Sequence, residues 1–384
     1  MIRLAPNGWV RTTVGEACSV RNDLRLPISR GERSGMSGIY PYYGPTGVLG
    51  RISEYRLDGT FALIGEDGDH FLDVINKPQT ILVTGQFNVN NHAHVIASTD
   101  VCRAEWFYNY FRHRSLTEYL TRQGAGRYKL NKATLEKLPI LLPPVEEQDA
   151  INHVFREWAL GNEKAEKLIA AKERHYTHEL SRLISGGHHP RSHVSTFAHE
   201  VSERNRGGNE ARVLSVTNSR GFVLPEDQFE RRVASADLSN YKVVKRGQYA
   251  YNPSRINVGS IARLDDWDEG VLSPMYVVFG LDEAGIDSDY FLHWLDSHEA
   301  RERIKKSAQG SVRETVSFTE FAAIAIPLPN PGKQAAIARY LNALRKEIST
   351  LGAYAEKLRT QKRGLMQKLL TGQWRVKVKE QEVA

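Results

Sequence analysis

The chain is poor in cysteine and has no long hydrophobic run. Its two cysteines, Cys18 and Cys102, lie far apart, and neither belongs to a Cys-x-x-Cys pair. This pattern excludes a disulfide framework and a cysteine zinc site, and it indicates free thiols in a reducing compartment. No stretch approaches the roughly 18 apolar residues of a membrane span, and residues 1–10 lack the apolar core of a secretory signal. We therefore expect a cytoplasmic protein without a membrane segment.

Catalytic motifs are also missing. The sequence has no Gly-x-x-x-x-Gly-Lys-Ser/Thr loop to hold nucleotide phosphates. Asn252-Pro253-Ser254-Arg255 resembles the Asn-Pro-Pro-aromatic motif of amino-methyltransferases, but it lacks the second proline and the aromatic residue. His92 and His94 have no third potential metal ligand near them in the sequence. His188 and His189 lie with His193 in a glycine-containing linker, and we expect the histidines of both groups to be structural or solvated. We expect this chain to be no enzyme and to hold neither a cofactor nor a metal.

Composition and charge are compatible with a nucleic-acid partner. The 384 residues suffice for two or three domains, and 41% hydrophobic with 25% charged residues is ordinary globular material. The formal net charge is +7, with 16 tyrosines and 6 tryptophans. Cations neutralise phosphates, and aromatic rings stack on bases or pack on sugars. Charge alone does not decide the matter, because many proteins are mildly basic without binding DNA.

A long internal repeat divides the chain. The segment Gln123-Gly124-Ala125-Gly126-Arg127 recurs as Gln309-Gly310-Ser311-Val312-Arg313, an offset of 186 residues. The same offset then holds without a gap for about sixty residues, so that Gln148 corresponds to Gln334. Upstream of these segments the two halves differ. The chain is therefore predicted to consist of two tandem units, each a variable globular part followed by a shared tail.

Each shared tail is predicted to form one long helix. The first follows Pro143-Pro144 and has two glutamates in its first turn, where carboxylates favour the helix dipole. The second follows Asn330-Pro331, a pair typical of a helix start. Gly186 and Gly372 stand where a left-handed C-cap glycine is expected.

An apolar seam runs along each predicted helix. In the first helix it consists of Ile151, Phe155, Trp158, Ala165, Ile169, Tyr176 and Leu183, with Asn162, Lys172 and Glu179 interrupting it. In the second it consists of Ile337, Leu341, Leu344, Ile348, Leu351, Ala355, Leu358, Leu365 and Leu369. Such spacing is typical of a coiled coil. We expect the two helices to pack antiparallel; two separate helices, each lying on its own domain, are the alternative.

Both globular parts are predicted to be α+β, with a curved or barrel-like sheet. In the first, strands are expected at 61–65, 80–85 and 94–97, followed by a helix from about Ala104 to Thr121. In the second, strands are expected at 211–216, 248–251, 260–264 and 275–279, followed by a helix from about Ser288 to Ser307.

The arrangement of these parts resembles that of a known family. Two variable parts alternating with two near-repeated long helices are the plan of type I restriction–modification specificity (S) subunits. Tyr40-Pro41-Tyr42-Tyr43-Gly44-Pro45-Thr46-Gly47 with Ala62-Leu63-Ile64-Gly65-Glu66-Asp67-Gly68 is similar to one type of recognition domain in that family. The segment Gly247 to Ile261 resembles another type. The resemblance covers essentially the whole chain.

The resemblance implies an organisation and a function. It implies target-recognition domain 1 at 1–143, a spacer helix at 144–186, target-recognition domain 2 at 187–329, a second spacer helix at 330–374, and a tail at 375–384. Each recognition domain would bind one half of a bipartite, asymmetric site in double-stranded DNA. The helices would set the gap and dock two methyltransferase subunits, to which restriction/translocase subunits can be added. S-adenosylmethionine, ATP and Mg would belong to those partners.

Candidate DNA contacts are polar or aromatic residues in predicted loops. Amides and arginine make bidentate contacts to base edges, while lysine and tyrosine suit phosphates. Arg127 and Arg313 occupy equivalent positions in the repeat, and pairing with a local carboxylate is an equal alternative for both. Asparagine also occurs in turns for backbone reasons. The candidates are Tyr42, Tyr43, Thr46, Asn88, Asn90, Asn91, Arg127, Tyr128, Lys129, Asn252, Ser254, Arg255, Asn257 and Arg313.

Two other interpretations stay open. A coiled-coil scaffold whose two globular parts bind proteins would have negligible affinity for DNA. A stand-alone modification enzyme would transfer methyl groups without added subunits. The acidic turn with Glu66, Asp67 and Asp69 has no lysine at nuclease spacing, and we expect it to be structural, with a role in orienting a basic neighbour.

Overall fold

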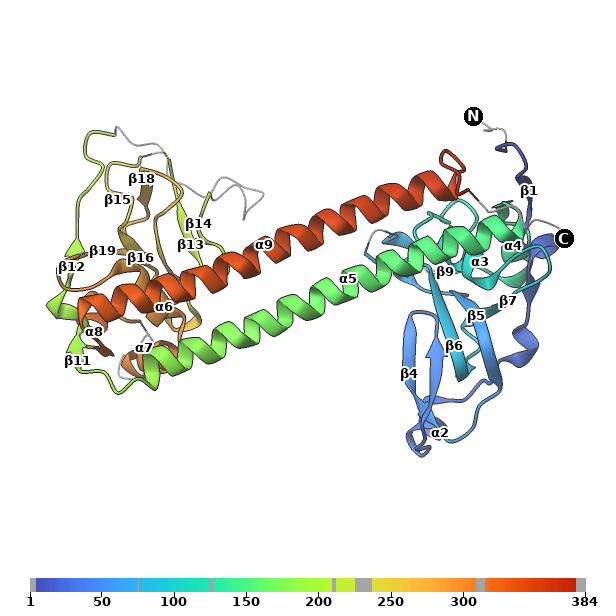
Figure 1. Ribbon diagram of the computed structural model, residues 1–384, viewed down its shortest axis with the longest axis horizontal. Coiled ribbons are helices and arrows are strands. Elements are labelled where there is room, and N and C mark those ends of the chain that lie inside the picture. Colours follow the sequence, from blue (N-terminus) through green and yellow to red (C-terminus); the bar gives the residue numbers. More distant parts are fainter. Residues whose placement is uncertain are drawn as a thin grey trace. The chain divides into compact units, whose positions relative to one another are not determined.

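The computed structural model describes residues 5–74, 76–123, 127–208, 212–224, 237–308 and 315–377. The fold is α+β, as predicted, and the chain forms two compact units. Unit 1 contains Met1–Lys164 together with Ala355–Ala384, and unit 2 contains Ala165–Tyr354. Each unit therefore holds one globular part and a portion of each long helix (Figure 1).

Unit 1 is built on a six-stranded sheet in the order β2-β7-β5-β6-β3-β4. Its strands are β2 (Ser19–Val20), β3 (Tyr40–Gly44), β4 (Gly47–Ile52), β5 (Leu57–Gly65), β6 (Thr80–Val89) and β7 (Ala93–Ala97). The remaining elements are β1 (Val10–Thr13), α1 (Val14–Ala17), α2 (Arg30–Ser34), α3 (Ala104–Phe111), β8 (Thr121–Gln123), β9 (Arg127–Lys129), α4 (Lys132–Glu136) and β10 (Pro139–Leu142). The sheet is open, with β2 and β4 as its outer strands.

Unit 2 contains a four-stranded sheet in the order β12-β19-β16-β17 and several strand pairs. Its strands are β11 (Arg191–His193), β12 (Ala198–Val201), β13 (Ser215–Thr217), β14 (Gly221–Val223), β15 (Lys242–Lys245), β16 (Tyr249–Tyr251), β17 (Ile261–Arg263), β18 (Glu269–Leu272), β19 (Val277–Leu281) and β20 (Ala325–Pro327). Its short helices are α6 (Ser288–Asp296), α7 (His298–Ala308) and α8 (Phe318–Ala322). The two globular parts thus differ in strand number and order.

The long helices are α5 (Val145–Leu180) and α9 (Pro331–Leu370), close to the predicted bounds. In unit 1 the start of α5 and the end of α9 share a core, with Ile151 and Phe155 against Leu369. In unit 2 the end of α5 and the start of α9 share another, with Leu180 against Ile337. The helices are therefore antiparallel within each unit, and the predicted seam residues are buried or half-buried.

The C-caps of the two helices differ. Gly372 has a φ of +67°, in the left-handed region, as predicted. Gly186 has a φ of −84°, so the prediction of a left-handed cap was wrong there. The last turn before it, Ser181–Ser185, is a π-helix whose Ser181 carbonyl accepts from the Gly186 amide. This wider turn satisfies the terminal carbonyl without a left-handed residue.

Two predicted helix ends were also wrong. Helix α3 stops at Phe111 and does not reach Thr121, because Arg114 stacks on the Tyr110 ring and donates its Nε–H to the Tyr110 carbonyl, closing the helix end. The helix predicted from Ser288 to Ser307 is broken at Ser297, whose backbone is extended and whose Oγ accepts from the Ala300 amide. Ser297 thereby caps a second helix, α7.

The repeat is visible in how each unit attaches to its long helix. Gln148 and Gln334 are both buried. The Gln148 amide accepts from the Arg103 amide and donates to the carbonyls of Val101 and Pro143, at 2.8–2.9 Å. Gln334 accepts from the Asp287 amide and donates to the Pro329 carbonyl, each at 2.8 Å.

A second contact repeats beside each glutamine. Trp106 in α3 donates to the Leu141 carbonyl, and Tyr290 in α6 donates to the equivalent carbonyl of Pro327. Strand β1 pairs with β10 in one unit, and β11 pairs with β20 in the other. The same joint, here called the glutamine joint, thus fixes a different globular part to each long helix.

Candidate nucleic-acid interface

The β3–β4 hairpin contains three candidate residues, and they lie in different environments. Tyr42 is fully buried, accepts from the Ile28 amide and donates to the Leu26 carbonyl. Tyr42 therefore holds the segment before α2 against the hairpin, and its role as a DNA contact stays a prediction. Tyr43 is half-buried against Phe87, and Thr46 is exposed in the turn. Residues 42–47 span the end of β3, the turn and the start of β4.

The candidate asparagines at the end of β6 and in the turn to β7 mostly have structural contacts. Asn88 is fully buried and donates to the Glu54 carbonyl, and its role as a DNA contact stays a prediction. Asn90 is 7% exposed, and its Oδ1 accepts from the His92 amide, so this side chain shapes the turn. Asn91 is exposed, and its carbonyl accepts from Arg25. Of the three, Asn91 alone presents its side chain at the surface.

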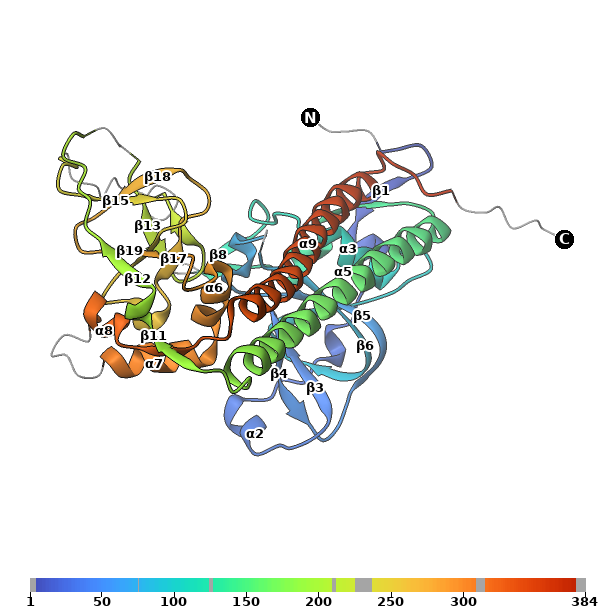
Figure 2. The same ribbon diagram turned by 60° about the vertical axis from the view of Figure 1, so that its left-hand side comes forward.

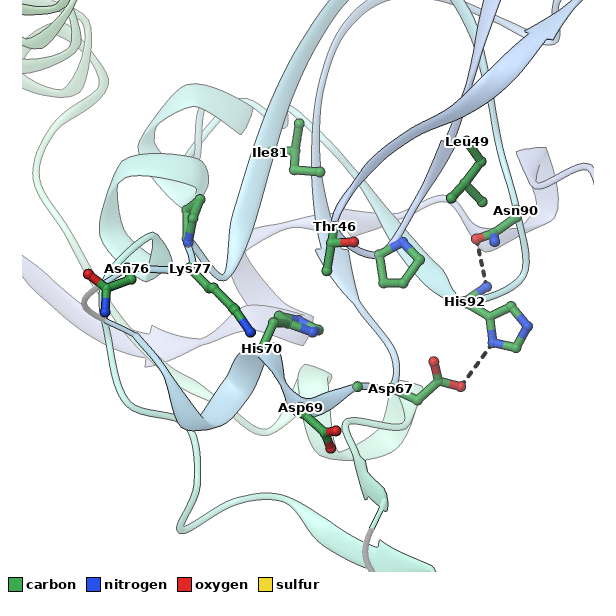
Figure 3. A pocket seen from close by; sticks show the side chains of 13 residues that line it. Thr46, Leu49, Asp67, Asp69, His70, Asn76, Lys77, Ile81, Asn90 and His92 are labelled. Carbon is green, nitrogen blue, oxygen red and sulfur yellow. Dashed lines mark hydrogen bonds and ion pairs between the residues drawn. The ribbon is translucent and has the colours of Figure 1, made fainter. Parts of the chain in front are cut away.

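A cavity of about 770 Å³ lies beside these turns. Figure 3 shows Thr46, Asn90 and His92 on one side and Asp69, His70, Asn76 and Lys77 on the other. His70 on its wall is 4% exposed, and in the described part of the chain neither ring nitrogen has a hydrogen-bond partner. Burial lowers the pKa of His70, so the ring is neutral near pH 7. Its ring occupies the space beside Gly65 and Gly68, where an added Cβ would lie within 3 Å of it.

The acidic turn orients basic neighbours, as expected. Glu66 accepts from Arg25 at 2.8 Å and forms an ion pair with Lys129 at 3.4 Å. Asp67 pairs with His92 at 2.9 Å. Burial lowers the pKa of His94, which contacts the Leu130 carbonyl through Nε2 at 2.7 Å. The turn therefore connects the sheet to β9, which carries part of the repeated Gln-Gly-x-x-Arg segment.

The candidates of that segment are only partly described. Arg313 lies outside the described residues, and so does the side chain of Arg127. Tyr128 is half-buried and packs on the core of unit 1. Lys129 forms an ion pair with Glu66 at 3.4 Å. Its role as a DNA contact stays a prediction.

In unit 2 the candidates lie in one loop after β16. Asn252 accepts from the Ser254 amide through its side chain, so it has the backbone role named as the alternative. Ser254 and Arg255 are exposed. Asn257 is half-buried, and its Oδ1 has no hydrogen-bond partner in the described part of the chain. Arg255 is thus the exposed cation of this loop.

Sequence reasoning missed a group of arginines in unit 1. Residues 25–56 contain five arginines and no lysine, against two glutamates. Arg25 pairs with Glu66, whereas no ion pair forms at the other four within the described residues. These four are Arg30, Arg33, Arg51 and Arg56, here called the hairpin arginines. The local excess of arginine was a signal available in the sequence.

Within the described ranges, the structure brings no three histidine, cysteine or carboxylate side chains together as metal ligands. The thiols of Cys18 and Cys102 lie 3.5 Å apart, both buried and free. Their mutual hydrogen bond, together with burial, raises the pKa of Cys18. Among the described residues, no helix is both long enough and apolar enough for a membrane span.

The chain is similar in sequence to a known protein family and to several of its members. Residues 6–167 match the family model "Type I restriction modification DNA specificity domain". A Haemophilus influenzae protein named as a type I restriction enzyme specificity subunit is 32% identical over 136 residues, 35% of this chain and 34% of the relative. A Methanocaldococcus jannaschii protein named as the MjaX specificity subunit is 23% identical over 297 residues, 70% of this chain and 67% of the relative. The chain therefore spans from a third to two thirds of these relatives' lengths.

Solved structures share the fold. The S subunit of a type I restriction–modification system from M. genitalium superposes with a TM-score of 0.62 at 13% identity, covering 96% of this chain and 98% of the other. A structure from a type I restriction–modification system, solved to explain complex assembly, gives 0.56 at 12% identity and covers 97% and 100%. At such identities the likeness concerns the fold.

Proposed function

We propose that this chain is a type I restriction–modification specificity subunit and that it recognises a bipartite, asymmetric DNA target, one half by each globular part. Specificity subunits are non-catalytic members of their complexes, in agreement with the prediction that the chain is no enzyme. The recognition domains are proposed to lie at 1–143 and 187–329, the spacer helices at 144–186 and 330–374, and the tail at 375–384.

The observation that carries this proposal is the glutamine joint. Gln148 and Gln334 make equivalent bonds to the start of α3 and α6, while the sheets beyond them differ in strand number and order. Two different domains held by the same joint suit a target with two different halves. Identical domains would instead suit a palindrome.

The long helices are proposed to set the gap between the half-sites. Helix α5 has 36 residues, a rod of about 54 Å at ~1.5 Å per residue. Lys172 of α5 pairs with Glu347 of α9 at 2.7 Å, and Asp296 of α6 pairs with Arg345 of α9. Because the helices are held to each other and to the domain, a change in their length would be transmitted to the spacing.

The partners stay part of the proposal. Two methyltransferase subunits would dock on the helices, and restriction/translocase subunits could be added. S-adenosylmethionine, ATP and Mg would be bound by those subunits. The cytoplasmic location expected from the sequence is included in the proposal.

A domain exchange tests the two-domain arrangement. Replacing about Pro190 to Pro327 by the same segment of another specificity subunit should change one half of the methylated target and leave the other. The measurement is methylome sequencing of cells that also express the modification subunits. A target altered in both halves, or in neither, would contradict the proposal.

A second experiment separates this function from that of a protein-binding scaffold. The full chain should bind duplex DNA with an affinity that falls steeply as salt rises. A scaffold would show negligible DNA binding at low salt. Inserting one helical turn into both α5 and α9 should widen the target gap while each half keeps its sequence, and an unchanged gap would argue against the spacer role.

A further inference from the structure

The β3–β4 hairpin has the form of a two-stranded ribbon at the margin of unit 1. Strand β4 is an outer strand of the sheet, and β3 contacts β6 only at Tyr42 and Tyr43. A register shift between these two tyrosines interrupts the hairpin ladder, a feature that increases twist. In Figure 1 β4 and α2 lie at the lower end of this unit, while α3 and α4 lie at its upper end, and Figure 2 labels β3 beside β4. Most of the ribbon is therefore free of sheet neighbours on the β4 side.

Three of the hairpin arginines make contacts at or near this ribbon, and the fourth, Arg30, begins α2. The stem of Arg33 lies over Gly50, since an added Cβ there would be 3.3 Å from its Cδ, and its guanidinium stands 5.2 Å from the Tyr42 ring centroid. Arg51 opposes Pro41 in the neighbouring pair of the ladder, so it leaves the ribbon on the other face, and its Nη1 donates to the Ile39 carbonyl. Arg56 donates to the Arg25 carbonyl just after β4. Cationic groups thus stand on both sides of one narrow ribbon.

These cations are available to an external anion. Other arginines of unit 1 are neutralised locally, for example Arg103 by Asp149 and Arg375 by Glu147. Within the described residues no carboxylate pairs with any hairpin arginine, and Glu32 beside them is used by the Ser29 cap. Residues 25–56 hold a net charge of +3 of the chain's +7. A polyanion is the complementary partner.

The ribbon also exposes apolar side chains near its turn. Val48 is 53% exposed and Leu49 is 44% exposed, on opposite faces of β4, and Thr46 stands in the turn. In the major groove, a methyl group marks thymine, and aliphatic or threonine side chains contact it. That groove also admits a two-stranded β-ribbon. Exposed aliphatic groups flanked by arginines therefore match one groove of a duplex.

We propose that the β3–β4 hairpin is the element of the first recognition domain that enters the major groove, with the hairpin arginines bound to phosphates along its two edges. This inference rests on the proposed function and specifies its site in unit 1. Arg51 on an outer strand would also discourage edge-to-edge aggregation, so the test must separate DNA binding from solubility.

The test uses the full chain and a labelled duplex containing the methylated target, titrated at several salt concentrations. The variant R30Q/R33Q/R51Q/R56Q should lower the slope of log K against log salt by about three to four, near 0.9 per lost phosphate contact. Its affinity at low salt should fall at least ten-fold. The control R174Q/R339Q/K357Q/R363Q removes the same charge from exposed positions of α5 and α9 and should lower the slope by less than one.

The outcomes distinguish the two hypotheses. If the wild-type chain itself shows no salt-dependent DNA binding, the proposed function fails. If the wild type binds and the hairpin variant keeps its slope, or the control loses as much, the hairpin assignment is overturned. Sedimentation of each variant shows whether the loss reflects aggregation.

A second variant keeps the charge unchanged. V48S/L49S removes the methyl groups from two exposed side chains, so the fold should persist, and methylome sequencing should show relaxed or altered bases in the half recognised by the first domain. An unchanged first half, or a change in the second half, would contradict insertion of this hairpin.

Discussion

Replacing Gln148 by alanine should loosen the first domain from its helix. The side chain is fully buried and makes three hydrogen bonds, to the Arg103 amide and to the carbonyls of Val101 and Pro143. Each such bond contributes about 1 kcal/mol net, and an unsatisfied buried partner costs about 1–3 kcal/mol. We expect a loss of about 3 kcal/mol in the free energy of unfolding of unit 1. Gln334 makes two bonds, so Gln334→Ala should cost unit 2 about 2 kcal/mol.

The assay is native-state hydrogen exchange with mass spectrometry, because it assigns the loss to one unit of a chain that need not unfold in one step. Protection should fall in α3 and the start of α5 for Gln148→Ala, and in α6 and the start of α9 for Gln334→Ala. Gln148→Met is the matched control for volume, since it fills the site without the bonds and should lose nearly as much stability. Losses below about 1 kcal/mol in both alanine variants, or a loss in the wrong unit, would refute the joint as the attachment.

Three further predictions follow from single contacts. Glu147 is 3% exposed and accepts one hydrogen bond from Trp9 and two from Arg375. A double-mutant cycle with Glu147→Gln and Arg375→Ala, measured by denaturation, should give a coupling free energy of about 1–3 kcal/mol. Additive effects of the two substitutions would contradict attachment of the C-terminal tail at Glu147. Burial lowers the pKa of His293 to about 4; since its ordinary pKa is about 6.5, the folded state binds fewer protons, and unit 2 should lose up to ~3 kcal/mol as pH falls from about 6.5 to 4. His293→Gln should remove that part of the pH dependence, and an unchanged pH profile would count against it. Tyr42→Phe should cost unit 1 about 1–2 kcal/mol in thermal denaturation, because its hydroxyl makes two internal bonds, yet leave the methylated target unaltered; a changed target would support Tyr42 as a DNA contact.

The long helices could be predicted because their signals are local. The start of each helix is marked by proline and acidic or capping residues, and the seam follows from a spacing that any helix imposes. The ends of shorter helices could not, since they depend on contacts elsewhere. Arg114 closes α3 by folding back on Tyr110, and Ser297 breaks one predicted helix into two. Neither residue is a strong helix breaker by itself.

The candidate site divides in the same way. Asn252 was correctly suspected of a backbone role, because an Asx turn involves only residues two positions apart. Tyr42 and Asn88 lie in strings of polar and aromatic residues that indicate a surface loop, but their strands place them on the inner side. Which face of a strand a residue occupies depends on register with distant strands.

The sequence by itself determined the duplication, the two long helices and the resemblance to specificity subunits, because each is expressed in order and spacing along the chain. Only the tertiary structure decided that Gln148 and Gln334 are the shared attachment, that Lys129 is paired with Glu66, and that the four hairpin arginines have no carboxylate partner among the residues that the structure describes. Burial and pairing depend on segments that meet only after folding. The sequence alone shows that an arginine is charged, whereas its freedom to bind an external phosphate depends on which side chains the fold places beside it.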